Sequence, residues 1–464
     1  MHTLKNTPKQ ENSKFNYTIF YIIIMSNKRL LVLPVFIWAS STLGYLHSQT
    51  ENLTMSLDQL YEIAEQNNTS IRVFDTAVEE AKQSVAAAKA ERLPDLDASL
   101  SVSYLGNGFI TDRDFSNVTS VHIPHFGNNF ALKAVWAIYT GGALTSGIDL
   151  ARMGKELAAV NAEENRKRVR FAITGYYLQL HCLQNQVKVF EENIALTDSL
   201  LENIRNRYTQ GMALQNDITR YELQSESLKL ARTKALNKIE VVNRKLLTAL
   251  GQEADIHILT ADNFDVNTEI VSTEEYWQNE AALNSDVLRK SQIGIRMSDE
   301  KVRLEKSERL PKVALFAEDH LDGPITFEIP NLDNNIHYWF VGLSISYNLS
   351  SLYKNNKKIN RARVASLQAR ESHRDAVENT QTAVQEAYRD YLTMLAELET
   401  SNKSLELANR NYDVIYSRYT NGLAIVTDML DASNEKLNAE LNLVNSRINA
   451  IYHYYNLKFI SGTI

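Results

Sequence analysis

The chain has 464 residues, of which 23% are charged, and its 49 basic and 56 acidic residues leave a net charge of −7. No basic block of useful length appears, which argues against nucleic acid as a partner. The single cysteine, Cys182, excludes an internal disulfide framework, and its helical surroundings predict a buried, inert thiol. Only seven prolines and 16 glycines occur, which is typical of a mainly helical chain.

Residues 1–48 have the layout of a secretory signal peptide, with Met25 as an alternative start. Lys28 and Arg29 precede the apolar run LLVLPVFIWASSTLGYL, which ends in small and polar residues. A membrane anchor helix is the alternative, but Pro34 and the polar residues after it leave the apolar part short for the ~20 residues that a span requires. No cysteine lies near the expected cleavage region, so an N-terminal lipid anchor is chemically excluded.

Two long proline-free stretches, 143–250 and 352–460, predict long helices, because a proline inside a helix costs ~3 kcal/mol. Each stretch is dense in Ala, Leu, Glu, Asn, Lys and Arg. The last helix carries a heptad-like apolar stripe, which indicates packing against other helices along its length. The stripe consists of Leu430, Leu437, Leu441, Val444, Ile448, Ile451 and Tyr455.

The prolines cluster where the apolar period changes from helical to alternating. Four candidate strands follow from this change: 94–105, 128–139, 311–318 and 341–347. Strands of about ten residues in two hairpins match the length of a tilted transmembrane β-strand. Their connections, 106–127 and 319–336, are rich in Gly, Asn and Asp and predict exposed loops.

The sequence is duplicated with a shift of 211 positions near its helical turns. RYTQGMALQNDIT (207–219) recurs as RYTNGLAIVTDML (418–430), and ERLP at 91–94 recurs at 308–311. A period this long indicates duplication of a domain rather than a solenoid. We therefore divide the mature chain into three parts. They are a first repeat, 49–250 (strands about 94–140, helical hairpin about 143–250), a connecting or equatorial segment, 251–275, and a second repeat, 276–464 (strands about 311–349, helical hairpin about 352–460).

The glycine in each repeated turn predicts the tip of a long helical hairpin. Helices over about 143–210 and 352–420 would each reach ~100 Å at ~1.5 Å per residue, too long for a compact globular domain. Gly211 and Gly422 can reverse the chain because glycine adopts a positive φ without strain. We expect Asn216–Asp217 and Thr427–Asp428 to supply N-capping side chains for the return helices.

These features resemble the TolC-like outer-membrane efflux protein family. The resemblance extends from SLDQLYEIA (56–64) to LKFISG (457–462), and its most specific parts are the two Tyr-x-x-Gly turns and the duplicated proline-led strand hairpins. YTGG (139–142) also fits the family, whereas its counterpart NLSSLYKNN (348–356) lacks the paired glycines.

The resemblance implies an α+β membrane protein built from a duplicated unit of helix, β-hairpin and long helical hairpin. Three copies would form a 12-stranded β-barrel in outer-membrane lipid, continued by an α-helical barrel in the periplasm of a Gram-negative bacterium. Trimerisation would remove the open sheet edges that lipid does not tolerate. The implied partners are a periplasmic adaptor and an inner-membrane pump of RND or ABC type.

The resemblance also assigns roles to the tips. The residues implied to contact the adaptor are Gly211, Met212, Ala213, Gly422, Leu423 and Ala424; the alternative is a purely structural turn. Asp428, Asp431, Tyr419 and Asp217 match the constriction and its links, although acids in a first helical turn are also favoured by the helix dipole alone. Ala424 stands where the family has an arginine, which leaves the strength of the closed state open.

The sequence offers no catalytic constellation, metal-binding spacing or cofactor motif, so we expect neither an enzyme nor a cofactor. His181 is expected to pack rather than bind a ligand, and His122, His125 and His320 to lie in exposed loops. The predicted function is a passive outer-membrane exit duct for small molecules or drugs. The alternatives are the outer-membrane component of a type I protein secretion system and a non-channel periplasmic coiled-coil scaffold.

Overall fold

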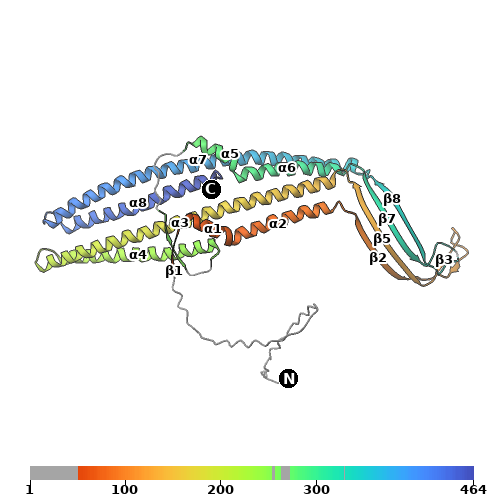
Figure 1. The fold of residues 1–464 in the computed structure, drawn as a ribbon, viewed down its shortest axis with the longest axis horizontal. Helices are drawn as coiled ribbons and strands as arrows, with labels where there is room; N and C mark the ends of the chain where they lie inside the picture. Colours follow the sequence, from red (N-terminus) through yellow and green to blue (C-terminus); the bar gives the residue numbers. More distant parts are fainter. Residues whose placement is uncertain (1–50, 253–255, 263–271, 329) are drawn as a thin grey trace, which may run out of the picture. The chain divides into compact units, whose positions relative to one another are not determined.

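A computed structural model describes residues 51–252, 256–262, 272–328 and 330–464 (Figure 1). The expected signal peptide lies outside these residues. The first half contains β1 Glu51–Met55, α1 Leu57–Asn67, α2 Thr69–Ala90, β2 Asp95–Tyr104, β3 Gly108–Ile110, β4 Thr119–Val121, β5 Phe126–Tyr139, α3 Ala143–Thr209 and α4 Gln215–Leu250. The second half contains β6 Ile256–Thr260, α5 Glu274–Asn284, α6 Asp286–Ser307, β7 Lys312–Gly323, β8 Ile336–Ser346, α7 Ser351–Thr420 and α8 Val426–Ile460.

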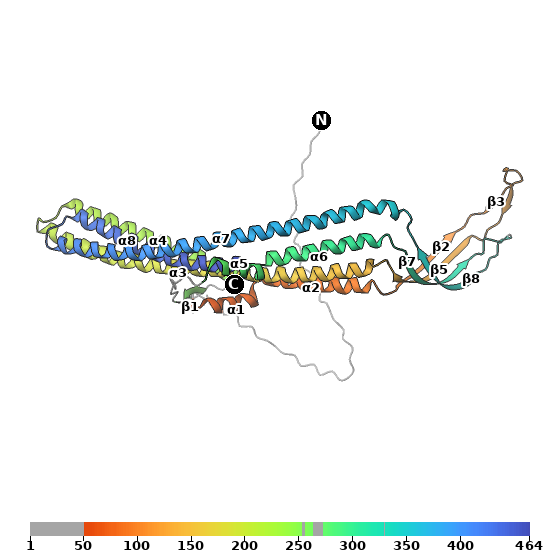
Figure 2. The same ribbon diagram turned by 90° about the horizontal axis from the view of Figure 1, so that it is seen from above.

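The two long helical hairpins form as the proline-free stretches predicted. Helix α3 has 67 residues and α7 has 70, so each reaches ~100 Å, and each packs along its partner, α4 or α8. Figures 1 and 2 show both hairpin tips at one end of this part of the chain and the strands at the other. None of the described helices is long and apolar enough to cross a membrane.

The four predicted strands form one antiparallel sheet in the order β2-β5-β7-β8. Two expectations about the connections were wrong. The connection 106–127 is not a plain loop, because β3 and β4 pair within it. Strand β7 continues to Gly323, so His320 lies in a strand, where its ring stacks on Tyr338 with 5.0 Å between centroids.

The alternation along the strands gives the sheet two chemically different faces. On one face, Lys133 forms an ion pair of 3.1 Å with Glu318, and Asp97 lies opposite Lys133 in the register. The other face is apolar and open to the surroundings. Its exposed side chains include Leu96, Leu100, Val102, Tyr104, Phe130, Trp136, Leu315, Val341, Leu343 and Ile345.

A short parallel pair, β1 with β6, joins the start of the first repeat to the connecting segment that follows it and was not predicted. Asn243 of α4 holds β6 through two hydrogen bonds, donating to the Ile256 carbonyl (2.7 Å) and accepting from the Ile258 N–H (3.0 Å). The Tyr177 hydroxyl of α3 donates to the Met55 carbonyl of β1 at 2.8 Å. The pair therefore links the middle of α3 to the C-terminal part of α4.

The duplication is also visible in the packing. Positions separated by 211 residues are buried at equivalent places in the two repeats. These pairs are Ile173 and Val384, Tyr177 and Tyr388, Val187 and Leu398, and Leu246 and Leu457. All of these residues except Val187 belong to two similar cores, one around α3 and α4 and one around α7 and α8. The shift of 211 therefore holds along both hairpins and not only at their turns.

Candidate functional site at the helical tips

Each helical tip reverses at a glycine in the left-handed conformation, as predicted. The φ angles are 76° at Gly211 and 73° at Gly422. The residue after each glycine donates its N–H to the carbonyl of an arginine five residues earlier, at 2.8 Å in both tips. This is the bonding that closes a helix at a C-terminal glycine. The two tips are therefore built alike.

The return helices begin differently from our expectation. The N-cap residues are Leu214 and Ile425, so the predicted N-capping by residues 216–217 and 427–428 was wrong. Asp217 and Asp428 instead lie one turn inside the helices and accept hydrogen bonds from the N–H groups of the cap residues, at 3.0 Å and 3.2 Å. Their carboxylates still stabilise the helix starts, because they satisfy a backbone donor and face the positive end of the helix dipole.

Each tip presents two large apolar side chains to the outside. Met212 and Leu214 are 66% and 69% exposed, and Leu423 and Ile425 are 69% and 66% exposed. Leu214 and Ile425 were missing from the predicted contact residues, although the duplication places them at equivalent positions in both turns. The predicted contact residues Ala213 and Ala424 pack inward against the side chains beneath the tips.

Beneath the turns, the two hairpins share one buried cluster, here called the tip cluster. It consists of Leu200, Leu201, Ile204, Ile218, Tyr221, Tyr412, Tyr419, Val426 and Met429. Burial raises the pKa of Tyr412 to about 12. Burial also raises the pKa of Tyr419, against the opposing effect of the Arg207 charge. These phenols stay neutral in the physiological range, and the cluster joins the first hairpin to the second through apolar contact.

Arg207 of the first hairpin clasps the end of α7 in the second. Its guanidinium donates to the carbonyls of Tyr419 (3.1 Å) and Thr420 (3.0 Å). The same group lies 4.6 Å from the centre of the Tyr419 ring, within range of a cation–π interaction. These carbonyls belong to the last turn of a helix, where a cation is favoured. Sequence reasoning missed Arg207, although it begins the repeated Arg-Tyr-Thr motif.

The predicted constriction residues are distributed over both hairpins. Asp428 and Asp431 are exposed and lie three positions apart on α8, so they share a face of the helix. Asp217 lies near enough to Tyr419 for its charge to raise the pKa of the phenol. The Tyr419 hydroxyl, however, is buried with no hydrogen-bond partner among the described residues, so a direct bond between this pair is absent in this conformation.

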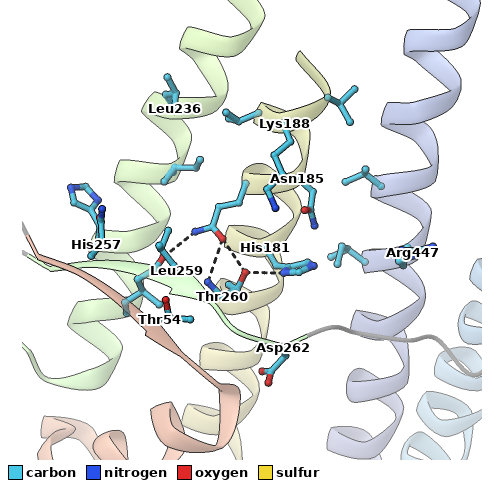
Figure 3. Close-up of a pocket in the computed structure, with 18 of the residues that line it drawn as sticks. Thr54, His181, Asn185, Lys188, Leu236, His257, Leu259, Thr260, Asp262 and Arg447 are labelled. Atoms are coloured by element: carbon cyan, nitrogen blue, oxygen red, sulfur yellow. Dashed lines mark hydrogen bonds between the residues drawn. The ribbon is translucent and has the colours of Figure 1, made fainter. Parts of the chain in front are cut away.

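A cavity of about 1000 Å³ lies farther along the helices, between β1, β6, α3, α4 and α8 (Figure 3). His181 points into it, and its Nδ1 lies 2.8 Å from the Thr260 hydroxyl. Burial lowers the pKa of His181, and the nearby Lys188 and Arg447 lower it further. Among the described residues, no group of three His, Cys, Asp or Glu side chains is placed to hold a metal. The cavity is thus lined by hydrogen-bonded and cationic groups without a metal-binding set.

The thiol of Cys182 lies where α3 packs against α8. It is half-buried, which raises its pKa to about 11, and it donates a hydrogen bond of 3.3 Å to Asn445 of α8. A thiol with a raised pKa is a poor nucleophile, as expected for a packing residue.

Comparison with known proteins gives a consistent result. The outer membrane efflux protein family matches residues 60–252 and 277–463. The outer membrane protein TolC of Escherichia coli (strain K12) is 21% identical over 450 residues, which cover 93% of this chain and 86% of that protein. Among solved structures, the outer membrane protein VceC of Vibrio cholerae matches with a TM-score of 0.70 at 15% identity, covering 88% of this chain and 96% of that one. The MtrE outer membrane channel of Neisseria gonorrhoeae, in its open state, matches with a TM-score of 0.69 at 16% identity, covering 88% and 89%.

Proposed function

The chain belongs to the outer membrane efflux protein family, and we propose that three copies form a passive exit duct that carries small molecules out of the cell. The family consists of outer-membrane transport ducts rather than enzymes, and the protein is located in the outer membrane with its helices in the periplasm. The observation that carries the proposal is that one chain has two different surfaces at its two ends. The sheet at one end exposes an apolar face suited to lipid, and the helical turns at the other end expose apolar side chains (Figure 1).

The sheet supports the trimer. Its apolar face suits hydrocarbon, and its polar face, with Lys133 and Glu318, suits a water-filled lumen. Strands β2 and β8 are its edges, and each leaves one row of backbone N–H and C=O groups unpaired. Because lipid does not satisfy such groups, four strands alone do not span a membrane stably. Three copies joined through β2 and β8 would give a closed barrel of twelve strands.

The tips support contact with a periplasmic adaptor, which would connect the duct to an inner-membrane pump. Each copy exposes four apolar side chains in its two turns, Met212 and Leu214 in one and Leu423 and Ile425 in the other. Both turns lie at the end opposite the sheet (Figure 1). Exposed apolar side chains that group in this way are typical of protein interfaces. Gly211 and Gly422 set the turns that present them, and Ala213 and Ala424 seat the turns on the tip cluster.

The acids near the second tip support a cation-selective constriction. In a trimer, Asp428 and Asp431 would each form a ring of three carboxylates, and such rings attract cations in channels. Both side chains are exposed in the single chain, which leaves them available to a lumen. Arg207 joins the two hairpins through its bond to the Tyr419 carbonyl, the charge of Asp217 acts on the Tyr419 phenol, and these contacts would hold the tips in the closed arrangement.

The proposal is tested by deleting the gene in its host and following export of a fluorescent efflux substrate. Export should be lost and should return with the wild-type chain. A variant with Met212→Ser and Leu423→Ser should reach the outer membrane and yet restore little export.

Crosslinking in intact cells should capture an adaptor and a pump with the wild-type chain; recovery of an ABC exporter with a secreted protein would favour type I secretion. Unchanged export after deletion would contradict the proposal.

A further inference from the structure

Within one chain, α3 of the first hairpin packs against α8 of the second, and specific polar side chains pair across this contact, here called the joint. Gln186 of α3 donates to Asn445 of α8 at 2.7 Å, and Asn193 of α3 donates to Glu440 of α8 at 2.8 Å. Near the tips, Arg207 closes the same joint by holding the end of α7. This joint therefore has a known register from the middle of the hairpins to their tips.

The duplication predicts a second joint of the same kind. A shift of 211 residues carries α3 onto α7 and α4 onto α8, so the contact of α3 with α8 becomes a contact of α7 with α4 of another copy. A closed ring of three chains contains six hairpins and therefore six joints, three within chains and three between them. This step rests on the proposed trimer.

In the single chain, several side chains of the first tip, α4 and α7 are exposed although their equivalents in the other repeat are covered. Leu230 is 55% exposed, whereas its equivalent Leu441 is half-buried. Leu407 is 50% exposed, whereas its equivalent Leu196 packs against the tip cluster. At the tips, Tyr208 is 43% exposed, whereas its equivalent Tyr419 is 3% exposed beneath Arg207. In each pair, the residue at the joint within the chain is covered, and the residue 211 positions away, at the predicted joint between chains, is exposed.

The chemistry of the mapped positions identifies the occupant as a second copy of this chain. Gln186 maps onto Glu397 of α7, and Asn445 maps onto Lys234 of α4, so a neutral amide pair becomes an acid with a base. Both charged side chains are exposed, and neither forms an ion pair with any described residue of its own chain. The geometry points to an ion pair between Glu397 of one copy and Lys234 of the partner subunit, on a docking surface formed by α7 and α4.

A clasp at the tips belongs to the same surface. Arg207 and Tyr419 map onto Arg418 and Tyr208, which are both exposed in the single chain. In the single chain Arg418 makes only a long bond of 3.4 Å to the Leu423 carbonyl of its own tip, and in the trimer it would instead cover Tyr208 of the partner subunit. At the level of Gln186 and Asn445 the joint within a chain is a neutral amide pair, whereas the equivalent level between chains is an ion pair, and this difference disfavours pairing of the wrong hairpins.

Charge exchange tests the pair. Glu397→Lys places like charges together, as does Lys234→Glu, and each single variant should raise the dissociated fraction of detergent-extracted protein several-fold at low salt. The double variant restores opposite charges and should return to within about twofold of wild type. The matched control combines Glu399→Lys with Lys234→Glu. Glu399 lies on a different face of α7 from Glu397, so this combination should not restore the pair. Equal dissociation in the single and double variants would overturn the pair.

Crosslinking tests the surface independently. In a Cys182→Ala background, Glu397→Cys with Lys234→Cys and a short bismaleimide should give a denaturing-gel ladder that ends at three chains. Gln186→Cys with Asn445→Cys, the equivalent pair within the chain, should give only a monomer of altered mobility. Absence of the ladder from protein whose native mass is three chains would refute the docking surface and leave the trimer standing. A native mass of one chain would refute the trimer itself.

Discussion

Replacing Arg207 with alanine is expected to loosen the second tip without unfolding the protein. The side chain is one of the polar links between the hairpins near the tips, through its bonds to the Tyr419 and Thr420 carbonyls and its position over the Tyr419 ring. Another is the bond of 3.1 Å from Arg220 to the Thr427 hydroxyl. The tip cluster beneath it remains intact in the variant, and the cores near β1 and α5 are far from the change. The loss should therefore appear as local opening.

The size of the effect follows from these contacts. A hydrogen bond from a charged donor contributes ~1.5–3 kcal/mol when it is sheltered. A cation–π contact at a partly exposed site adds ~0.5–1 kcal/mol. Because Arg207 is only half-buried, screening by solvent reduces the total, and we expect about 2 kcal/mol. This free energy corresponds to about a 30-fold increase in the population of the opened tip.

Amide hydrogen exchange measures this opening directly. In Arg207→Ala, the amides over residues 426–432 should lose about 30-fold of their protection, while those over 173–187 stay unchanged. Arg205→Ala is the matched control, because Arg205 pairs with Glu222 inside its own hairpin at 2.7 Å. If Arg207→Ala and Arg205→Ala exchange alike at the second tip, Arg207 does not hold the hairpins together.

Three further outcomes are expected. Leu100→Arg, on the apolar face of the sheet, should block membrane insertion at a cost of ~2–4 kcal/mol, whereas Ser101→Arg on the opposite face should insert; equal yields in a membrane fraction would contradict the assignment of the faces. Asp428→Asn with Asp431→Asn should lower cation preference in planar bilayers, most strongly at low salt, and an unchanged reversal potential would place the constriction elsewhere. Gly422→Val should reduce export while the native mass is retained, because a side chain at φ 73° costs ~1–2 kcal/mol; loss of the assembly instead would make this glycine a folding determinant.

The parts of the fold that the sequence predicted are those with a strong local signal. Helices α3 and α7 follow from long proline-free stretches, and β2 and β8 follow from strict alternation of apolar and polar residues. The tip glycines were predictable because a reversal between long helices requires a positive φ. Each of these signals lies within the element that it specifies.

The features that the sequence did not reveal depend on contacts between distant segments. Strands β1 and β6 have five residues each and pair across about 200 positions, so neither carries enough local pattern to be recognised. The clasp by Arg207 joins positions 212 residues apart. The exposure of Leu214 and Ile425 depends on which residue of the turn faces inward, and apolar composition alone suggests burial for both.

Native mass spectrometry of the protein extracted from outer membranes in mild detergent tests the central claim most directly. A trimeric duct predicts a complex of three chains, because the unpaired edges of β2 and β8 are satisfied only when three sheets join. A single chain whose β-structure is intact by circular dichroism would show that the sheet is stable without its neighbours and would contradict the duct.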